Sequence, residues 1–315
     1  MREHKDCVKK VVEGGGGIGY ASRMDSRFAR GLFLALCFLP LPCRAGVVVE
    51  DDLGNRVRLE RPVQRIVSLA PNITEILYAA GAGEKLVGAV EYSDYPAAAR
   101  RILRVGSSQA FDVEKIAALH PDIVFAWKSG NPAGLLDQLE TLGIRVVLVE
   151  PPDLPGIAKD IRMAGEIAGT DAIAEQSASA FLARYRELKE KYSGRRKVKI
   201  FYEIWNDPLM TVSQHQFIGE AMHLCGAIDV FGNLPSLVST VSVEAVLAAG
   251  PEAIVASGMG NVRPSWLDEW KKWDGFSASR HLYFVPADLI NRAGPRLLDG
   301  VEMLCGEVEA VRKGG

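Results

Sequence analysis

Mainly apolar runs alternate with amphipathic segments along most of this chain. The apolar runs are RIVSLA (65–70), KLVGAV (85–90), DIVFAW (122–127), IRVVLVE (144–150), KVKIFYEI (197–204), EAIVASG (252–258) and LYFVP (282–286). Runs of this kind are typical of strands buried on both faces of a parallel sheet. The segments between them place apolar side chains three or four positions apart, which predicts helices. The pattern therefore predicts an α/β protein with two lobes, each built around a central parallel sheet.

Two stretches of the chain, 130 positions apart, share a sequence pattern, with Val113, Glu114, Ala118, Pro121 and Ala126 identical to their counterparts. Residues 112–126 read DVEKIAALHPDIVFA and residues 242–256 read SVEAVLAAGPEAIVA. Each begins with a good N-cap residue, Asp112 or Ser242, continues as a short helix that stops before a proline, and ends as a buried strand. The separation is far longer than the period of about 20–50 residues found in solenoids. The repeat therefore indicates two similar lobes.

One glutamate, Glu114 or Glu244, occupies the same place in the first turn of each repeated helix. For either glutamate alone, compensation of the helix dipole is a sufficient reason, because acidic side chains are favoured at helix N-termini. The pairing favours a second role, in which a partner protein grips both lobes through two equivalent carboxylates.

The segment between the two alternating patterns, residues 151–194, is almost entirely helical in character. Its apolar side chains recur at steps of four and three and form one face: they are Ala174, Ala178, Phe181, Tyr185, Leu188 and Tyr192. From Asp171 to Tyr192 such a helix is about 33 Å long, at about 1.5 Å per residue. We therefore expect an N-terminal lobe (46–150), one long rigid linker helix that limits closure, and a C-terminal lobe (195–315).

The first 45 residues have the layout of an export signal. Basic side chains precede an apolar run, Leu32–Leu41, and a small residue, Ala45, ends the segment. This order is typical of a secretory signal peptide, and the run is too short to span a membrane. Residues 1–45 are therefore interpreted as an upstream extension followed by a cleavable signal peptide, with a mature chain from Gly46. Lipid anchoring through Cys43 is less favoured, because Pro-Leu-Pro before it fits a lipoprotein cleavage box poorly.

The charge balance argues against nucleic acid as a partner. The whole chain carries a formal charge of −2, and its first 45 residues hold eight basic and four acidic side chains. That leaves 29 basic and 35 acidic side chains, or −6, for the remainder. Nucleic-acid binding needs a basic footprint, which this balance does not provide.

Only two cysteines, Cys225 and Cys305, follow the predicted signal peptide. An even pair in an oxidising compartment is typical of a disulfide, which we expect here. Two buried free thiols are the alternative.

Catalytic motifs are absent from the sequence, which contains no G-x-S-x-G elbow, no P-loop and no H-E-x-x-H. Its five histidines have no metal-ligand spacing, so a bare metal ion is a poor candidate for the cargo. We therefore predict no catalytic residues, no metal site and no cofactor. An exported enzyme on the same scaffold stays the second functional class, because a fold does not fix a function.

Several motifs resemble those of one known family. They are SLAPNITEIL (68–77), YSDYP (92–96), the run ending at Trp127, QLETLGIRVV (138–147), NDPLMT (206–211) and RAGPRLLDG (292–300). Over residues 47–312 the chain is similar to the periplasmic substrate-binding proteins of helical-backbone type, which serve ABC importers for cobalamin, haem and ferric siderophores. The similarity is greatest to the members that carry cobalamin, and the cysteine pair falls where those members have a disulfide.

The resemblance implies a fold, a location and partners. It implies a ligand cleft between the lobes, a monomeric receptor in the periplasm, and delivery of the ligand to a membrane permease and its ATPase. Glu114 and Glu244 match the glutamates that dock each lobe onto arginines of the permease.

The resemblance also implies five ligand contacts. Tyr92 and Trp127 match aromatic residues that pack against the corrin ring, and Pro71 matches a residue at the cleft edge. Asp288 and Arg292 match polar contacts to the amide side chains of the ligand. A purely structural role is open to two of these residues, since Trp127 ends a buried strand and Arg292 stands where it can support the following helix.

The chain departs from the cobalamin-carrying members at two cleft positions, where Ser108 and Val238 replace tryptophans. Trp205 or Tyr202, at the edge of a strand in the second lobe, is expected to compensate, and Trp205 is placed among the ligand contacts. Aromatic faces with a few polar groups suit a large flat ligand. Cobalamin or another corrinoid is therefore the expected cargo, with haem or a ferric siderophore as the alternatives.

Overall fold

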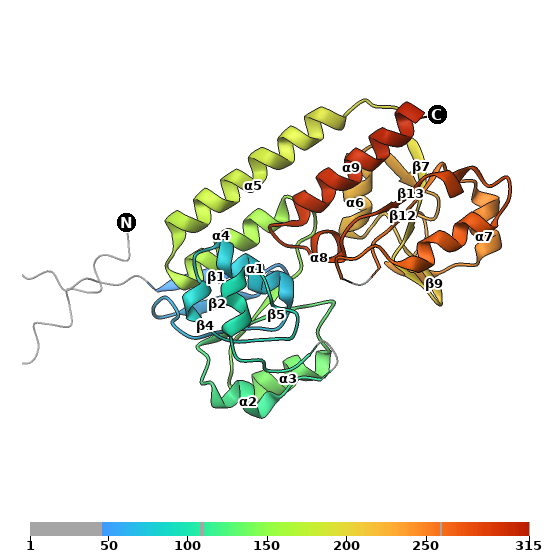
Figure 1. Cartoon of the computed structure of the whole chain (residues 1–315). Helices are drawn as coiled ribbons and strands as arrows, with labels where there is room; N and C mark the ends of the chain where they lie inside the picture. The colour runs from blue at the N-terminus through green and yellow to red at the C-terminus, as the bar shows by residue number, and fades with distance from the viewer. Residues whose placement is uncertain (1–45, 108–109, 259, 315) are drawn as a thin grey trace, which may run out of the picture. The chain divides into compact units, whose positions relative to one another are not determined.

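The computed structural model of the protein describes residues 46–107, 110–258 and 260–314 (Figure 1). The predicted extension and signal peptide, and the departure at Ser108, lie outside the described residues. Within the described part of the chain, no helix is long and apolar enough to cross a membrane. The described residues form two α/β lobes with parallel sheets at their centres, as the alternating pattern predicts.

The N-terminal lobe is built on a four-stranded parallel sheet with the order β4–β3–β5–β6. Its strands are β3 (Ile66–Ser68), β4 (Leu86–Ala89), β5 (Ile123–Trp127) and β6 (Val146–Val149). Its helices are α1 (Pro71–Ala79), α2 (Val113–Ala118) and α3 (Ala133–Thr141), with short 3-10 helices η1 (Gly83–Lys85) and η2 (Ala97–Arg101). A hairpin of β1 (Val47–Glu50) and β2 (Arg56–Leu59) precedes them. The central strand β3 is buried throughout, because helices cover both faces of such a sheet.

The C-terminal lobe repeats this plan and adds to it. Its parallel sheet has the order β10–β7–β12–β13. The strands are β7 (Val198–Glu203), β10 (Ala227–Asp229), β12 (Ala253–Ala256) and β13 (Leu282–Phe284). The helices are α6 (Phe217–Leu224), α7 (Val243–Ala249), α8 (Ala287–Ile290) and α9 (Leu297–Gly314), with 3-10 helices η3 (Ser265–Lys272) and η4 (Ser277–Arg280). An antiparallel sheet that the sequence pattern did not reveal joins β8 (Trp205–Asn206), β9 (Leu209–Val212) and β11 (Val238–Thr240).

Two helices occupy the segment between the lobes. The helix α4 (Gly156–Ala168) packs against β1 and α1, whereas α5 (Asp171–Tyr192) packs against α1 and also against α6 and α9 (Figure 1). The chain turns between them at Gly169, whose φ of 68° lies in the left-handed region that favours glycine. The predicted apolar face of α5 is buried except for Tyr185, which is half-buried. The helix α5 is therefore the element that contacts both lobes.

Cys225 at the C-cap of α6 and Cys305 in α9 form a disulfide, which confirms the sequence prediction. Both residues are buried. The bond fastens α6 to α9 across a sequence separation of 80 residues. In the chain-entropy model, closing a loop of this length stabilises the fold by up to about 4 kcal/mol.

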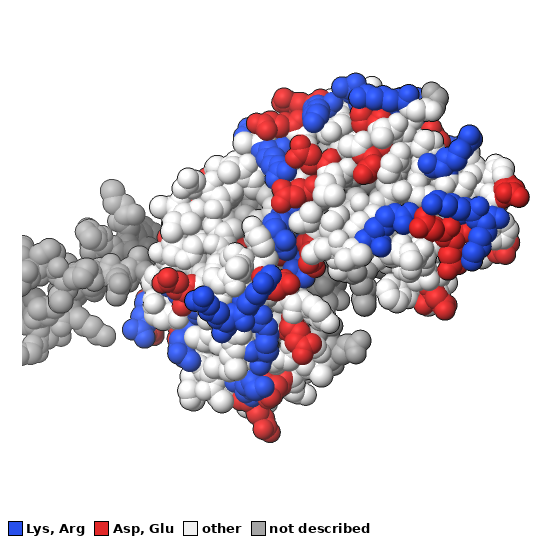
Figure 2. Space-filling view, in the orientation of Figure 1, with Lys and Arg blue, Asp and Glu red and all other residues white. Residues whose placement is uncertain are grey.

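Charges of both signs occur side by side on the face of the molecule drawn in Figure 2. Lysine and arginine side chains lie next to aspartate and glutamate side chains on both lobes of this face. This distribution agrees with the charge balance of the sequence, which predicts no basic footprint.

One buried carboxyl group in α4 has no hydrogen-bond partner among the described residues. Asp160, in α4, is fully buried, and neither of its carboxylate oxygens has a hydrogen-bond partner among the described residues. Burial, and then the charge of Asp52, raises the pKa of Asp160 well above its ordinary value. The carboxyl group of Asp160 therefore binds its proton more tightly in the folded protein than in the unfolded chain. Its stabilising effect is present at low pH and is lost as the pH rises above the ordinary aspartate range.

Asp160→Asn should therefore raise the free energy of unfolding near neutral pH. The expected gain is about 1–3 kcal/mol, because the amide is neutral without binding a proton, and it should shrink as the pH falls toward about 4. Urea unfolding at several pH values measures both effects. Glu166→Gln, an exposed carboxylate on the same helix, is the matched control and should change little. Equal effects of the two substitutions would contradict the assignment.

Candidate functional site

A cleft of about 820 Å³ lies between the two lobes. The N-terminal lobe lines it with the segments that follow β3, β4 and β5, and the C-terminal lobe lines it with the loop after β12 and with α8. Parallel sheets present the carboxyl ends of their strands at one edge, which is the usual place for a ligand in an α/β protein. The cleft is therefore the candidate ligand site.

The structure brings five of the six expected ligand contacts to this cleft. Its lining includes Pro71, Tyr92, Trp127, Asp288 and Arg292. The first three come from the N-terminal lobe and the last two from the segment around α8 in the C-terminal lobe. Residues up to 221 positions apart in sequence thus share one surface, which makes joint contact with a single ligand possible.

The sixth expected contact, Trp205, is not among the residues that line the cleft. It lies in β8, where its indole N–H donates a hydrogen bond of 2.7 Å to the carbonyl of Asp207 at the adjoining turn. Tyr202 is fully buried in β7, so the idea that it replaces a missing cleft tryptophan is wrong. Alternation along the strand turns this side chain into the core. In this structure neither residue lines the cleft.

Trp127 is held in place by its own loop. It is the last residue of β5 and is half-buried. The side chain of Asn131 accepts a hydrogen bond from the Trp127 backbone N–H (2.7 Å) and donates one to the carbonyl of Leu69 (3.0 Å). At Gly130 a Cβ atom would come within 2.1 Å of the Trp127 ring, so only glycine lets the loop close over the indole. The loop therefore presets the orientation of the indole before any ligand arrives.

Tyr92 presents the most exposed aromatic face of the cleft. Its side chain is 73% exposed although it is a large apolar ring. Its φ of 61° places it in the left-handed region, which is uncommon for a bulky residue. An exposed aromatic residue with a strained backbone is typical of a binding position.

Arg292 belongs to an ionic cluster that joins the two lobes. Its guanidinium lies 3.2 Å from the carboxylate of Glu75 in α1, 2.7 Å from Asp288 and 3.5 Å from Asp94. Arg296 donates two further hydrogen bonds to Glu75, of 2.6 and 2.9 Å. Glu75 is only 3% exposed, so its negative charge depends on these arginines. The sequence contains one hint of the cluster, an acidic residue inside the apolar stretch ITEIL.

The charged side chains that line the cleft are mostly acidic. Among the described residues they are Glu91, Asp94, Asp288 and Arg292. The guanidinium of Arg292 is already engaged by three carboxylates, counting Glu75. The described cleft wall therefore offers no unpaired cation to a ligand.

The two copies of the sequence repeat have the same local structure. Asp112 accepts a hydrogen bond from the backbone N–H of Lys115 (2.8 Å), and Ser242 accepts the equivalent bond from Ala245 (3.2 Å). Both predicted N-caps are thus confirmed. Each helix then ends at a residue with positive φ just before the proline, because a left-handed residue reverses the chain. These residues are His120 (φ 44°) and Gly250 (φ 57°).

A second pair of acids in the repeat has a structural role that the sequence did not reveal. Asp122 accepts hydrogen bonds from the backbone N–H groups of Gln64 and Arg65, just before β3. Glu252 likewise accepts one from the N–H of Lys199 in β7, at 2.9 Å. Each acid fastens the start of one central strand to its neighbour.

Unlike Asp122 and Glu252, the carboxylates of Glu114 and Glu244 are free of partners among the described residues. Both are exposed in the first turn of α2 and α7, and neither carboxylate forms an ion pair or hydrogen bond with a described residue. The two carboxylates are therefore accessible to a partner, one on each lobe.

Two α/β lobes with a cleft between them are typical of a ligand-binding protein, and comparison with known proteins agrees. The family model described as "Periplasmic binding protein" matches residues 66–285, and the chain belongs to this family. A vitamin B12-binding protein of Vibrio campbellii is 35% identical over 252 residues, which cover 80% of this chain and 92% of that protein. The crystal structure of the periplasmic vitamin B12 binding protein BtuF of Vibrio cholerae is 33% identical, with a TM-score of 0.74 over 80% of this chain and 99% of that one. A periplasmic heme binding protein from Pseudomonas aeruginosa, 24% identical, shares the fold with a TM-score of 0.69 over 78% of this chain and 92% of that one.

Glu75→Gln should destabilise the protein, because it leaves two partly buried arginines without their shared counter-charge. The expected loss is about 3–5 kcal/mol in the free energy of unfolding, measured by urea denaturation. Glu302→Gln is the matched control, since Glu302 pairs with Arg184 on the surface and should cost under about 1 kcal/mol. Comparable losses in the two variants would show that the inter-lobe cluster does not stabilise the fold.

Proposed function

We propose that this protein is a periplasmic receptor that captures cobalamin and delivers it to an ABC-type importer. The observation that carries the proposal is the inter-lobe cleft, where two aromatic side chains meet a wall without an unpaired cation among the described residues. The similarity to vitamin B12-binding proteins over most of the chain supports it. Cobalamin is thus a transported ligand, and the protein acts as a carrier without catalytic activity.

The aromatic residues suit the shape of a corrinoid. The flat faces of Trp127 and Tyr92 offer large contact areas at a low cost in side-chain entropy. Pro71, at the first position of α1, adds a rigid apolar edge. Asp288 and Arg292 are then the polar groups that orient the ligand through its amide side chains.

Charge favours a corrinoid over the two alternative ligands. Corrinoids carry neutral amide groups around the ring, whereas haem carries two propionates and many ferric siderophore complexes are anionic. An anionic ligand in this cleft would face Glu91, Asp94 and Asp288 with no unpaired cation on the described wall. A neutral amide can instead donate to a carboxylate and accept from a guanidinium. The cleft therefore supports cobalamin over haem or a ferric siderophore.

Handover to the permease is assigned to Glu114 and Glu244. Both are exposed, and each stands at the equivalent position of one lobe. Two equivalent acids suit a membrane partner that presents arginines to both lobes, because bidentate arginine–carboxylate pairs are strong and geometrically specific. This role requires a periplasmic location, reached through the export signal expected at the N-terminus, and a monomeric receptor.

Cobalamin should bind one-to-one, and Tyr92→Ala and Trp127→Ala should each weaken binding by about tenfold or more, because each removes a large aromatic contact. Isothermal titration measures stoichiometry and affinity. Tyr92 is the safer position to change, since its exposed ring contributes little to the core. Trp205→Ala is the matched aromatic control and should bind normally. Tight binding of haem or a ferric siderophore, with no response to cobalamin, would overturn the ligand assignment.

Glu114→Arg combined with Glu244→Arg should abolish cobalamin uptake while cobalamin affinity and melting temperature stay near the unchanged protein's values. Each single reversal should give a partial, salt-sensitive loss, because exposed charges act largely through the association rate. Uptake assays beside binding titrations measure both properties. Glu187→Arg, an exposed reversal on α5, is the control. Normal uptake by the folded double variant would leave helix-end compensation as the whole role of the two acids.

A further inference from the structure

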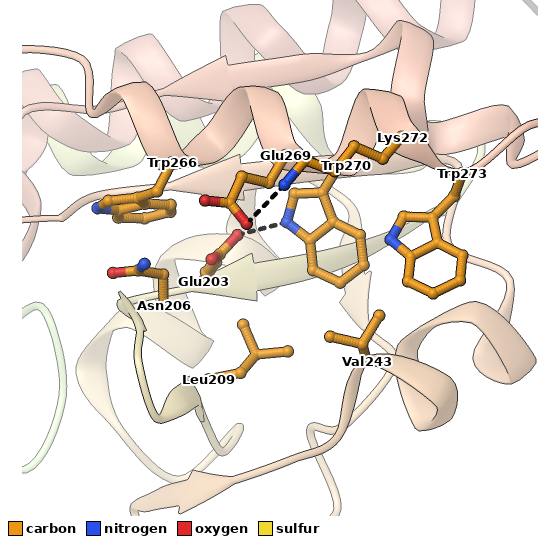
Figure 3. Close-up of a pocket in the computed structure, with 9 residues that line it drawn as sticks. All are labelled: Glu203, Asn206, Leu209, Val243, Trp266, Glu269, Trp270, Lys272 and Trp273. Atoms are coloured by element: carbon orange, nitrogen blue, oxygen red, sulfur yellow. Dashed lines mark hydrogen bonds and ion pairs between the residues drawn. The ribbon is translucent and has the colours of Figure 1, made fainter.

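A second cavity lies wholly within the C-terminal lobe (Figure 3). Its volume is about 210 Å³, and none of its lining residues lines the inter-lobe cleft. Three indoles form much of its wall, those of Trp266, Trp270 and Trp273. Glu203 and Glu269 bring two carboxyl groups to the same cavity.

The 3-10 helix η3 explains why these side chains gather on one side. A 3-10 helix has three residues per turn, so side chains three positions apart lie in line. Trp266 and Glu269 form one such line, and Trp270 and Trp273 form the next. Trp273, just after the helix, is 41% exposed, which is unusual for an indole without a partner.

Glu203 reaches the cavity from below, at the end of β7 (Figure 3). It is 1% exposed, and one carboxyl oxygen accepts a hydrogen bond of 2.7 Å from the Trp270 indole N–H. Its other oxygen has no hydrogen bond to a described residue. Burial raises the pKa of Glu203 to about 8. The hydrogen bond from Trp270 lowers this pKa, and the negative charge of Glu269 raises it. The carboxyl group thus lacks a cation close enough to hold its charge.

The lysine that lines the cavity, Lys272, does not supply that cation. The ammonium of Lys272 lies 3.4 Å from Glu269, and its side chain is 72% exposed. The pair is therefore solvated at the rim of the cavity and contributes little to the interior. An acidic, aromatic interior is left, with room for a small group.

The chemistry of the cavity wall limits the class of ligand that can bind there. An anion would meet the buried carboxyl group of Glu203 and, among the described lining residues, no unpaired cation. A purely apolar ligand would cover the second carboxyl oxygen of Glu203 without giving it a partner. An organic cation satisfies both features, because indole faces attract cations and carboxylates neutralise them. The cavity is smaller than the roughly 300–1,000 Å³ of sites for drug-sized ligands, so the cation must be small.

We propose that this cavity binds a small methylated ammonium ion, held beside the indoles of Trp266, Trp270 and Trp273 and by the carboxylate of Glu203, with Glu269 at the rim. The site is separate from the cleft and does not depend on the identity of the transported ligand. Binding converts Glu203 into its charged form, with the proton released to solvent.

Choline is the probe, and 3,3-dimethyl-1-butanol, which has the same shape without the charge, is its control. Titration followed by the NMR signals of the indole N–H groups should show saturable shifts at Trp270 and Trp273 with choline. The uncharged alcohol should bind at least about fivefold more weakly, because it lacks the cation–π and ionic attraction. An equal response to both compounds would show an ordinary apolar pocket, and no saturable response to choline would overturn the proposal.

Two variants and a reciprocal control locate the site. Trp273→Ala should weaken choline binding by about two- to fivefold, and its exposure makes the change tolerable for folding. Glu203→Gln keeps an acceptor for Trp270 but loses the negative charge, and it should weaken choline binding by about tenfold. Trp127→Ala, in the cleft, should leave choline binding unchanged, and Trp273→Ala should leave cobalamin binding unchanged. Loss of choline binding in Trp127→Ala would place the ammonium in the cleft and overturn the proposal.

Discussion

The buried carboxylate of Glu75 is the interaction on which the arrangement of the two lobes depends. It lies in α1 of the N-terminal lobe, and its partners Arg292 and Arg296 come from the segment between α8 and α9. Removing a carboxylate from water is costly, so it is tolerated only where cations from the other lobe neutralise it. Tyr95 adds to the contact, since the Arg296 guanidinium lies 3.9 Å from the centre of its ring. The same cluster draws Arg292 into the cleft wall and sets the charge that a ligand meets there.

Helical contacts reinforce this ionic link. The helix α5 contacts elements of both lobes, and Arg184 in α5 pairs with Asp299 and Glu302 in α9. The disulfide then fastens α9 to α6. These elements are packed helices rather than flexible strands, so they resist large changes of angle between the lobes. A cleft with preset aromatic side chains, such as Trp127 held by Asn131, suits a receptor that captures its ligand with limited closure.

The two lobes share a plan, but each adds something different to it. The repeat supplies both lobes with an N-cap at the same position, an acid that fastens a strand, and an exposed glutamate. The N-terminal lobe provides the aromatic side of the cleft, and the C-terminal lobe provides its arginine and Asp288. Among the described residues, only the C-terminal lobe has the three-stranded antiparallel sheet and the tryptophans of η3. Similar lobes therefore account for the two equivalent exposed glutamates, whereas the differences between the lobes account for the cleft and for the cavity beside η3.

The sequence by itself determined the features that depend on neighbouring residues. Short-range patterns predict the buried strands, the N-caps at Asp112 and Ser242, and the apolar face of α5. The presence of just two cysteines after the expected signal peptide predicts the disulfide. Family resemblance then named five residues that the structure brings to one cleft. Only the tertiary structure decided the partners of Glu75, which are more than 200 residues away, and the positions of Trp205 and Tyr202 away from the cleft. Ion pairs and cavities form between distant segments, so no local pattern specifies them.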